Sequence, residues 1–520
     1  MAGGYPCQYV LRQTSGARDV KKDKSESPAG KYSPSRLSGE DCVVSRNSIR
    51  RPLSAPYSVL QWPIFSRELF LDSNYAGARP WPSPSESGHI FSVTQLALLG
   101  HYLTNTCRTI PFDADELYVL QVGIPNLAFR SKPLMASLLA LAAASKAFDL
   151  VNSLTPFEHL DEIRQLLSFA DVHYHSSLRE IQASVSYVDN FDHILANAAL
   201  MVLYGLASHC VRIRLTRMAR LRNETLPVDL LPEGTQWIYL IRAAHSAYVG
   251  LLHDPGHGAL EEAIYESSDS ADSSDSMSSF DIPTLYESRV LSPENGPSEK
   301  TRNMLFPIVA ATQASAFQKL RDRCQAVAAS EYSQDFLDPE MQSCFVAMEI
   351  LNDIATTVFV DEAIDPQFTE QPNLKSEPCL EGPLSKVSPW LRTYIARVTS
   401  VEPSKPLRRT VTAFLNQVPM DYLRLVQSML DNLTEDPENQ SPYYLDDEPS
   451  LSCPKNQLAL EIFAHWLVLV MLLDGVWWIG DIGDWEMKRI MSFMERRELH
   501  SNAEDGWWPK TMFSIRQDLF

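Results

Sequence analysis

The spacing of apolar residues divides the chain near residue 90. From there to the C-terminus, apolar positions recur every three to four residues in one segment after another, which is the period of helices that bury one face. No segment alternates convincingly between apolar and polar residues, and no Asn-Gly turn joins two such segments into a hairpin. The pattern therefore predicts an all-α fold: a large irregular helical array over residues 91–520, without a fixed repeat.

Two capping boxes predict where individual helices begin. Ser92 is followed three residues later by Gln95, and such a pair satisfies the free backbone N–H groups at a helix start. Thr155 and Glu158 repeat this arrangement, with Pro156 at the first helical position. We expect a helix to begin at each box, and the second helix to be long and amphipathic.

An alanine-rich helix is predicted to lie at the centre of the array. It opens at Pro133 and carries Ala136, Ala140 and Ala144 one turn apart. Such a narrow strip of small side chains lets a neighbouring helix approach closely. We therefore expect other helices to pack tightly against this one.

The chain is expected to stay inside the cell and to contain no membrane span. It has no apolar signal segment at its start, and its eight cysteines are widely spaced, as is usual in a reducing compartment. The strongest membrane candidate, Ile462–Leu473, is well short of the ~20 apolar residues that cross a bilayer. A buried helix is the better interpretation.

Two segments have the composition of disordered chain. Residues 11–90 mix Ser, Pro, Gly and charged residues without apolar periodicity, which predicts a flexible basic linker. Residues 261–281 contain seven acids, eight serines and no Lys or Arg, so we expect a disordered acidic insertion at about 261–300. The insertion could contact activating partners or accept phosphate, or it could be a tolerated surface loop.

Charge is unevenly distributed. The net charge of −20 combines about +5 in residues 1–60 with about −25 in the remainder. A cationic arm on an anionic body is typical of a tail that contacts a polyanion, although a solvated linker would have the same pattern.

Sequence patterns of enzymes are mostly missing. Asn352 and Thr356 are placed like two ligands of the magnesium triad of all-α terpene synthases, but the third position is Val360, which cannot coordinate a metal. There is no G-x-S-x-G, Walker or dinucleotide motif. We expect a protein that is not an enzyme; an all-α metal-dependent lyase is the weakest alternative.

Tryptophans gather in the last quarter of the ordered region and form a candidate ligand pocket. They supply large rigid apolar surfaces with few charges nearby, and could hold a small apolar ligand such as a sterol. They could equally be core residues. The residues concerned are Trp466, Trp477, Trp478 and Trp485.

The N-terminal segment "GYPCQYV" around Cys7 resembles the end of the fungal six-cysteine binuclear zinc cluster. In that cluster the last cysteine follows a short Gly-containing turn and precedes a basic linker. Four later segments resemble the regulatory helical domain of the same transcription factors, especially those similar to sterol-uptake-control regulators. They are "LALLGHYLTNTCRTI", "VGIPNLAFRSKPLMASLLALAAASKA", "ANAALMVLYGLASHC" and "WLVLVMLLDGVWWIGDIGDWEM".

The resemblance implies a nuclear regulator of RNA polymerase II transcription, pathway-specific for sterol, lipid or secondary metabolism. It divides the chain into a cluster remnant (1–10), the linker (11–90) and the helical regulatory domain (91–520). It also implies zinc in a full-length form, DNA and the transcription machinery as partners, and contacts that could make a homodimer.

The resemblance also has a gap, since Cys7 is the only zinc-cluster ligand in the chain. We expect an upstream exon to supply the others, or else a short form that binds partners and not DNA. Without the missing cysteines this chain should hold no zinc stably. Its basic residues Arg12, Arg18, Lys21 and Lys22 would contact the DNA backbone without reading sequence.

The main alternative function follows from the same gap. A helical protein that senses a ligand or binds a partner, independently of DNA, would have the same predicted helices and the same incomplete cluster.

Overall fold

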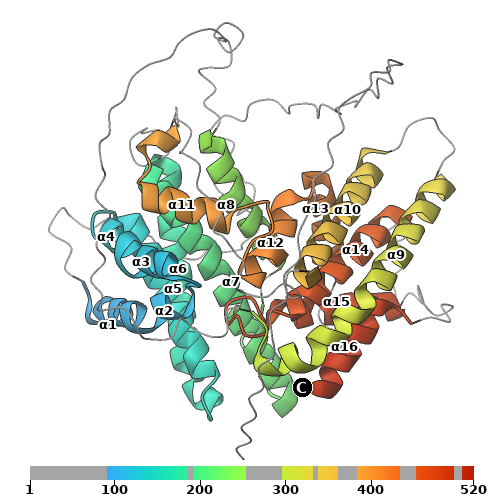
Figure 1. The fold of residues 1–520 in the computed structure, drawn as a ribbon. Coiled ribbons are helices and arrows are strands. Elements are labelled where there is room, and N and C mark those ends of the chain that lie inside the picture. Colours follow the sequence, from blue (N-terminus) through green and yellow to red (C-terminus); the bar gives the residue numbers. More distant parts are fainter. Residues whose placement is uncertain are drawn as a thin grey trace, which may run out of the picture. The chain divides into compact units, whose positions relative to one another are not determined.

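The computed structural model describes residues 91–184, 191–232, 234–252, 296–331, 338–360, 383–433, 453–496 and 506–520. Within these ranges the chain forms helices and connections and no strand, which confirms the all-α class for the described part (Figure 1). The cluster remnant at 1–10, the linker at 11–90 and the acidic stretch at 261–281 lie outside the described residues.

The first half of the fold is built on three long helices that are preceded by short ones. The elements are α1 (Val93–His101), η4 (Tyr102–Thr106), α2 (Cys107–Thr109), α3 (Ala114–Tyr118), η5 (Val119–Gly123), α4 (Ile124–Ala128), α5 (Lys132–Val151), η6 (Pro156–His159), α6 (Leu160–Ser184) and α7 (Phe191–Arg222). Here η marks a 3₁₀ or π turn.

The second half contains more helices of medium length. They are η7 (Val228–Leu230), α8 (Gln236–Leu252), η9 (Thr301–Leu305), α9 (Phe306–Glu331), α10 (Pro339–Val360), η12 (Pro383–Lys386), α11 (Pro389–Val398), α12 (Leu407–Gln417), α13 (Met420–Asp431), α14 (Pro454–Met471), α15 (Ile482–Arg496) and α16 (Trp508–Leu519).

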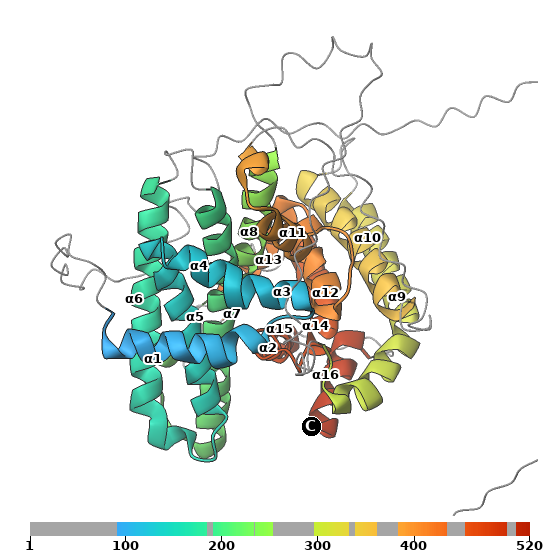
Figure 2. The same cartoon turned by 60° about the vertical axis from the view of Figure 1, so that its left-hand side comes forward.

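Helix α5 is central to the first half, as its alanines predict. It packs against both α6 and α7, beside which it runs in Figure 2. Ala140 and Ala144 are fully buried and Ala136 is half-buried, so small side chains do face the neighbouring helices. Close approach of helix backbones increases dispersion contacts across the interface.

Helix α14 is central to the second half. It contacts α10, α13, α15 and α16, and every residue from Leu458 to Leu473 is buried. Apart from Glu461 and His465 this stretch is apolar all round, and such a helix must be covered on all sides. The predicted buried helix at Ile462–Leu473 is therefore confirmed, although its last regular residue is Met471.

Two other helices are long and apolar enough to cross a membrane by length and composition. These are α5 and α7, and 72% and 89% of their respective apolar windows are buried against the rest of the described structure. Core helices of other proteins pass the same test of length and composition.

The predicted helix boundaries are partly right. Ser92 accepts a hydrogen bond from the Gln95 backbone N–H, and Gln95 accepts one from Ser92, so the first capping box is confirmed. The box at Thr155 is wrong: Thr155 makes no side-chain cap, and Pro156–His159 forms a 3₁₀ turn before α6 begins at Leu160.

Two features of the second half are absent from the sequence-based prediction. The apolar periodicity of residues 410–433 is shared by two helices, because Val418 is extended at the C-terminus of α12 and Pro419 precedes the first residue of α13, Met420. Proline disfavours a helical conformation in the residue before it. The last helix, α16, lies beyond the tryptophan cluster and was not predicted.

We predict that Gly483→Ala lowers the free energy of unfolding by about 1–3 kcal/mol. A Cβ at Gly483 would lie 2.9 Å from the backbone N of Met471, which belongs to α14 and cannot move independently. The matched control is Gly100→Ala in α1, where a Cβ meets nothing within 4 Å. That variant should gain about 0.5–1 kcal/mol from helix propensity. Denaturant unfolding midpoints measure the stability of both variants. Equal changes in the free energy of unfolding would contradict the close approach of Gly483 to the backbone of Met471.

Candidate functional site

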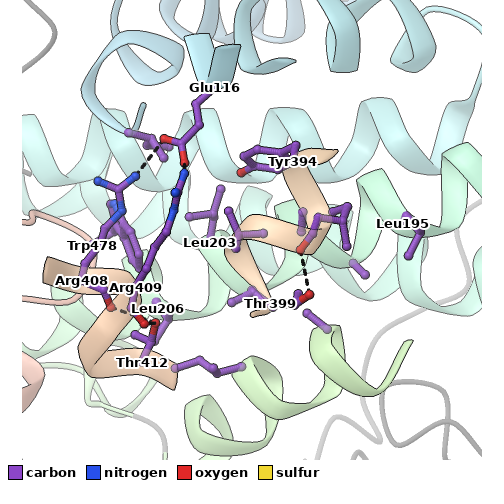
Figure 3. A pocket seen from close by; sticks show the side chains of 18 residues that line it. Glu116, Leu195, Leu203, Leu206, Tyr394, Thr399, Arg408, Arg409, Thr412 and Trp478 are labelled. Atoms are coloured by element: carbon purple, nitrogen blue, oxygen red, sulfur yellow. Dashed lines mark hydrogen bonds and ion pairs between the residues drawn. The ribbon is translucent and has the colours of Figure 1, made fainter. Parts of the chain in front are cut away.

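A cavity lies among helices that are far apart in the sequence. Its wall is formed by α3, α7, α8, α11, α12 and the segment after α14 (Figure 3). The space open to the centres of water molecules is ≈ 90 Å³. One water needs about 10–15 Å³ on this measure, so the cavity has room for several waters or for a small molecule.

One side of the cavity is apolar and is supplied mainly by α7. Leu195, Ala198, Val202 and Leu206 recur at helical spacing, so they share one face of this helix. Helix α8 adds Ile241, and α11 adds further aliphatic side chains. A ligand with an apolar portion would displace water from this face favourably.

The other end of the cavity is a buried ion triad of Glu116, Arg408 and Arg409. Arg408 Nη2 donates to Glu116 Oε2 at 3.0 Å, and Arg409 Nη2 donates to Oε1. The backbone N–H of Phe112 donates to Oε2 at 2.6 Å. The side chains of Glu116, Arg408 and Arg409 are 2%, 6% and 9% exposed, so the three charges interact in a medium of low polarity.

Local sequence explains how the triad is held. Asp113 caps α3 by accepting from the Glu116 backbone N–H at 2.8 Å, which fixes Glu116 in the first turn of that helix. The arginines occupy the first turn of α12, which follows Pro406. Cations are unfavourable at a helix N-terminus by about 0.3–1 kcal/mol each, so Glu116 offsets a cost that α12 creates.

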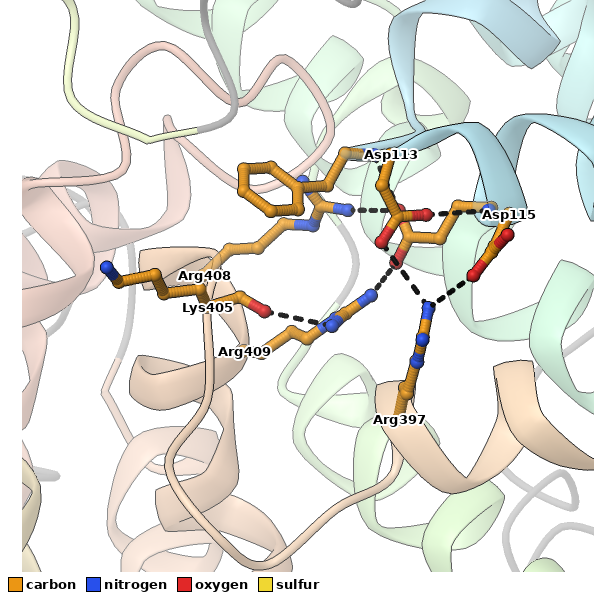
Figure 4. A network of polar contacts seen from close by, with 8 residues as sticks. Asp113, Asp115, Arg397, Lys405, Arg408 and Arg409 are labelled. Carbon is orange, nitrogen blue, oxygen red and sulfur yellow. Dashed lines mark hydrogen bonds and ion pairs between the residues drawn. The ribbon is translucent and has the colours of Figure 1, made fainter. Parts of the chain in front are cut away.

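An outer layer of charges surrounds the triad. Arg397 Nη1 donates to Asp113 and to Asp115, at 3.4 Å in both cases (Figure 4). Arg409 Nη1 donates to the carbonyl oxygen of Lys405 at 2.9 Å. The Asp115 side chain is 71% exposed, and water screens it much more than it screens the triad.

Tyr394 completes the polar end. It is buried, and its hydroxyl points toward the triad (Figure 3). Burial raises the pKa of Tyr394, and the charge of Glu116 raises it further. Burial also lowers the pKa of Arg408, while Glu116 opposes that shift. Tyr394 is therefore a neutral donor at physiological pH, and the guanidinium of Arg408 is held where its charge is poorly solvated.

The structure does not bring the four candidate tryptophans into one pocket. Trp478 lines the cavity described above. Trp466 is fully buried, donates to the carbonyl of Val411 at 2.9 Å and stacks on Phe414, so it is a core residue.

The other two tryptophans lie elsewhere. Trp477 donates from Nε1 to Thr109 Oγ1 at 3.1 Å. Trp485 lies under the guanidinium of Arg220, 5.1 Å from its ring centroid. The predicted aromatic pocket is thus replaced by a cavity with an aliphatic wall, to which Trp478 contributes.

The candidate residues of the N-terminal arm lie outside the described residues. They are Cys7, Arg12, Arg18, Lys21 and Lys22.

No group of three metal-ligating side chains occurs in the part of the chain that the structure describes. Thr356, considered above as a magnesium ligand, donates to the carbonyl of Asn352 at 2.8 Å within α10, and its side chain faces outward.

Comparisons with known proteins give no match: no family model, no curated protein and no solved structure resembles the chain at a significant level.

The residues that dominate the cavity were not singled out in the sequence. Glu116 is 292 positions from Arg408, and neither residue is part of a known motif. The available signal was physical: two adjacent arginines at the start of the amphipathic segment "LRRTVTAFLNQ" are an unusual choice for a helix N-terminus.

We predict that Glu116→Gln destabilises the fold by about 3–5 kcal/mol, because it leaves two buried guanidinium groups without a compensating charge. The matched control is Glu162→Gln, which removes the half-exposed partner of Lys146. Exposed pairs contribute about 0–1 kcal/mol, so the control should be close to neutral. Thermal and denaturant unfolding measure both variants. A loss at Glu116 no larger than that at Glu162 would show that the triad is not a strongly coupled buried group.

Proposed function

We propose that this protein is a nuclear regulator of RNA polymerase II transcription, pathway-specific for sterol, lipid or secondary metabolism, and not an enzyme. The basic arm (Arg12, Arg18, Lys21 and Lys22) contacts the DNA backbone, and the helical body responds to a small molecule and contacts the transcription machinery. A homodimer through the helical body is part of the proposal. Zinc belongs to a form that carries a complete cysteine cluster.

The main support is the resemblance of "GYPCQYV" and of four later segments, in the same order, to zinc-cluster regulators. The segments with this resemblance include most of α1 and α5 and parts of α7, α14 and α15. An all-α body with a cavity between helices distant in sequence is compatible with a ligand-responsive domain. That cavity is the one observation of the structure that favours regulation over a purely structural role.

The alternative is a helical ligand-binding protein that never acts at chromatin. The same cavity supports it, and Cys7 and the basic arm would then have no role in DNA binding. The two functions differ in where the protein is found in the cell, and chromatin immunoprecipitation of the tagged full chain separates them. Enrichment at a restricted set of promoters is expected for the regulator; its absence would favour the alternative.

We predict that the purified full chain binds DNA of random sequence weakly and in a strongly salt-dependent manner. Each phosphate contact that is lost reduces the slope of log K against log salt by about 0.9. For a variant that replaces all four basic residues of the arm with alanine, the magnitude of the slope of log K against log salt should therefore fall by up to about 3.6. Fluorescence anisotropy across a salt series measures the change. The residues replaced are Arg12, Arg18, Lys21 and Lys22.

A control variant removes the same charge from the exposed surface of the helical body. If both variants lose affinity equally, the arm has no special role in DNA contact; if only the control loses affinity, the basic site lies elsewhere. The residues replaced are Arg108, Arg130, Lys319 and Lys386, all of them exposed.

A further inference from the structure

The cavity has a net buried positive charge. Among the described side chains that line it, the formally charged ones are Glu116, Arg408 and Arg409, two cations and one anion. Both oxygens of Glu116 already accept from the arginines. Two buried cations that share one buried anion lose hydration, and a second anion in the cavity would reduce that cost. The site therefore favours an anionic ligand over a neutral or cationic one.

Donors near the triad are not all satisfied. Arg409 Nε and Trp478 Nε1 are buried and have no hydrogen-bond partner among the described residues. Both residues are part of the cavity wall. Both nitrogen atoms are covered, so an acceptor in the cavity reaches them only if the side chains move. A carboxylate pairs well with a guanidinium group, often through two parallel hydrogen bonds.

The apolar part of the cavity wall determines the chemistry of the other end of the ligand. The α7 face formed by Leu195, Ala199, Val202 and Leu203 offers aliphatic side chains and no charge. A ligand that reached only the triad would leave this apolar face wet. A ligand with an alkyl chain would cover it, at about 0.8 kcal/mol for each buried CH₂.

We propose that the cavity is a binding site for a small amphipathic monocarboxylate, with the carboxylate at Arg408 and Arg409 and the alkyl chain along α7. Tyr394, whose hydroxyl points toward the triad, donates to the second carboxylate oxygen (Figure 3). The limited volume of ≈ 90 Å³ restricts the ligand to a short or medium chain. This inference is independent of the DNA-directed function, because ligand binding involves no DNA.

Isothermal titration calorimetry on the purified full chain tests the proposal with a series of straight-chain probes. Hexanoate, octanoate and decanoate test chain length, and octanol and octylamine test charge. We expect one molecule of octanoate per chain and an affinity for octanol at least tenfold weaker, with no binding of octylamine. Equal affinity for octanoate and octanol, or no binding of any of the acids, would overturn the proposal.

Two variants test the contacts of the carboxylate end and of the alkyl end of the ligand separately. Arg409→Gln should weaken octanoate at least tenfold and leave octanol unchanged. Ala199→Leu fills the apolar face with the triad intact, and should weaken octanoate and octanol alike. Because Arg409→Gln alters a buried network, the circular dichroism spectrum of this variant is compared with that of the wild type. If Arg409→Gln fails to fold, Ala199→Leu still tests the site.

Controls of the same chemistry lie away from the cavity. Arg424→Gln removes an exposed arginine that pairs with Asp421, and Ala326→Leu enlarges an exposed alanine of α9. Both should bind octanoate like the wild type. Octanoate that binds Ala199→Leu as tightly as it binds the wild type would place the binding site elsewhere on the protein and would refute the proposal.

Discussion

The ion triad of Glu116 with Arg408 and Arg409 is the interaction on which the architecture around the cavity depends. It joins α3, near the start of the described chain, to α12, 292 positions later. These helices form part of the cavity wall, and α7, α8 and α11 complete it. Without a charge on α3, the two arginines would occupy the unfavourable end of α12 with no compensation. The triad therefore sets both the position of α12 and the electrostatic character of the space beside it.

A buried ion group that joins two helices carries a large free-energy cost, because its charges lose their hydration. Apolar side chains of similar volume are often as stabilising, or more so, because charges lose hydration when they are buried. The core of this protein shows that the chain can use apolar contacts, since α14 is buried on all sides without such a group on most of its length. Buried ion groups also lie away from the cavity, as between Arg516 and Asp484, so the triad is distinguished by its place at the end of an apolar cavity. The same physics explains the predicted preference for an anion, because the triad has one cation in excess.

The sequence was most informative about features that depend on local periodicity. The first capping box, the alanine face of α5 and the apolar α14 each follow from residues within a few turns of one another. The cavity could not be predicted in this way, because it depends on the packing of helices hundreds of residues apart. Glu116 is one acid among many, and only its position opposite α12 makes it important. The tryptophans were the more visible signal, yet Trp466 is used for the core, where its ring stacks on Phe414.

Hydrogen exchange of the full chain with and without octanoate tests the central claim most directly, because it reports on the helices that the triad connects. The account predicts slower amide exchange in α3, α11 and α12 when octanoate is present, since the added carboxylate neutralises the excess charge and stabilises their contacts. Exchange in α9 and α16, which do not line the cavity, should stay the same. Unchanged exchange around the triad at saturating octanoate, or protection confined to α9 and α16, would contradict it.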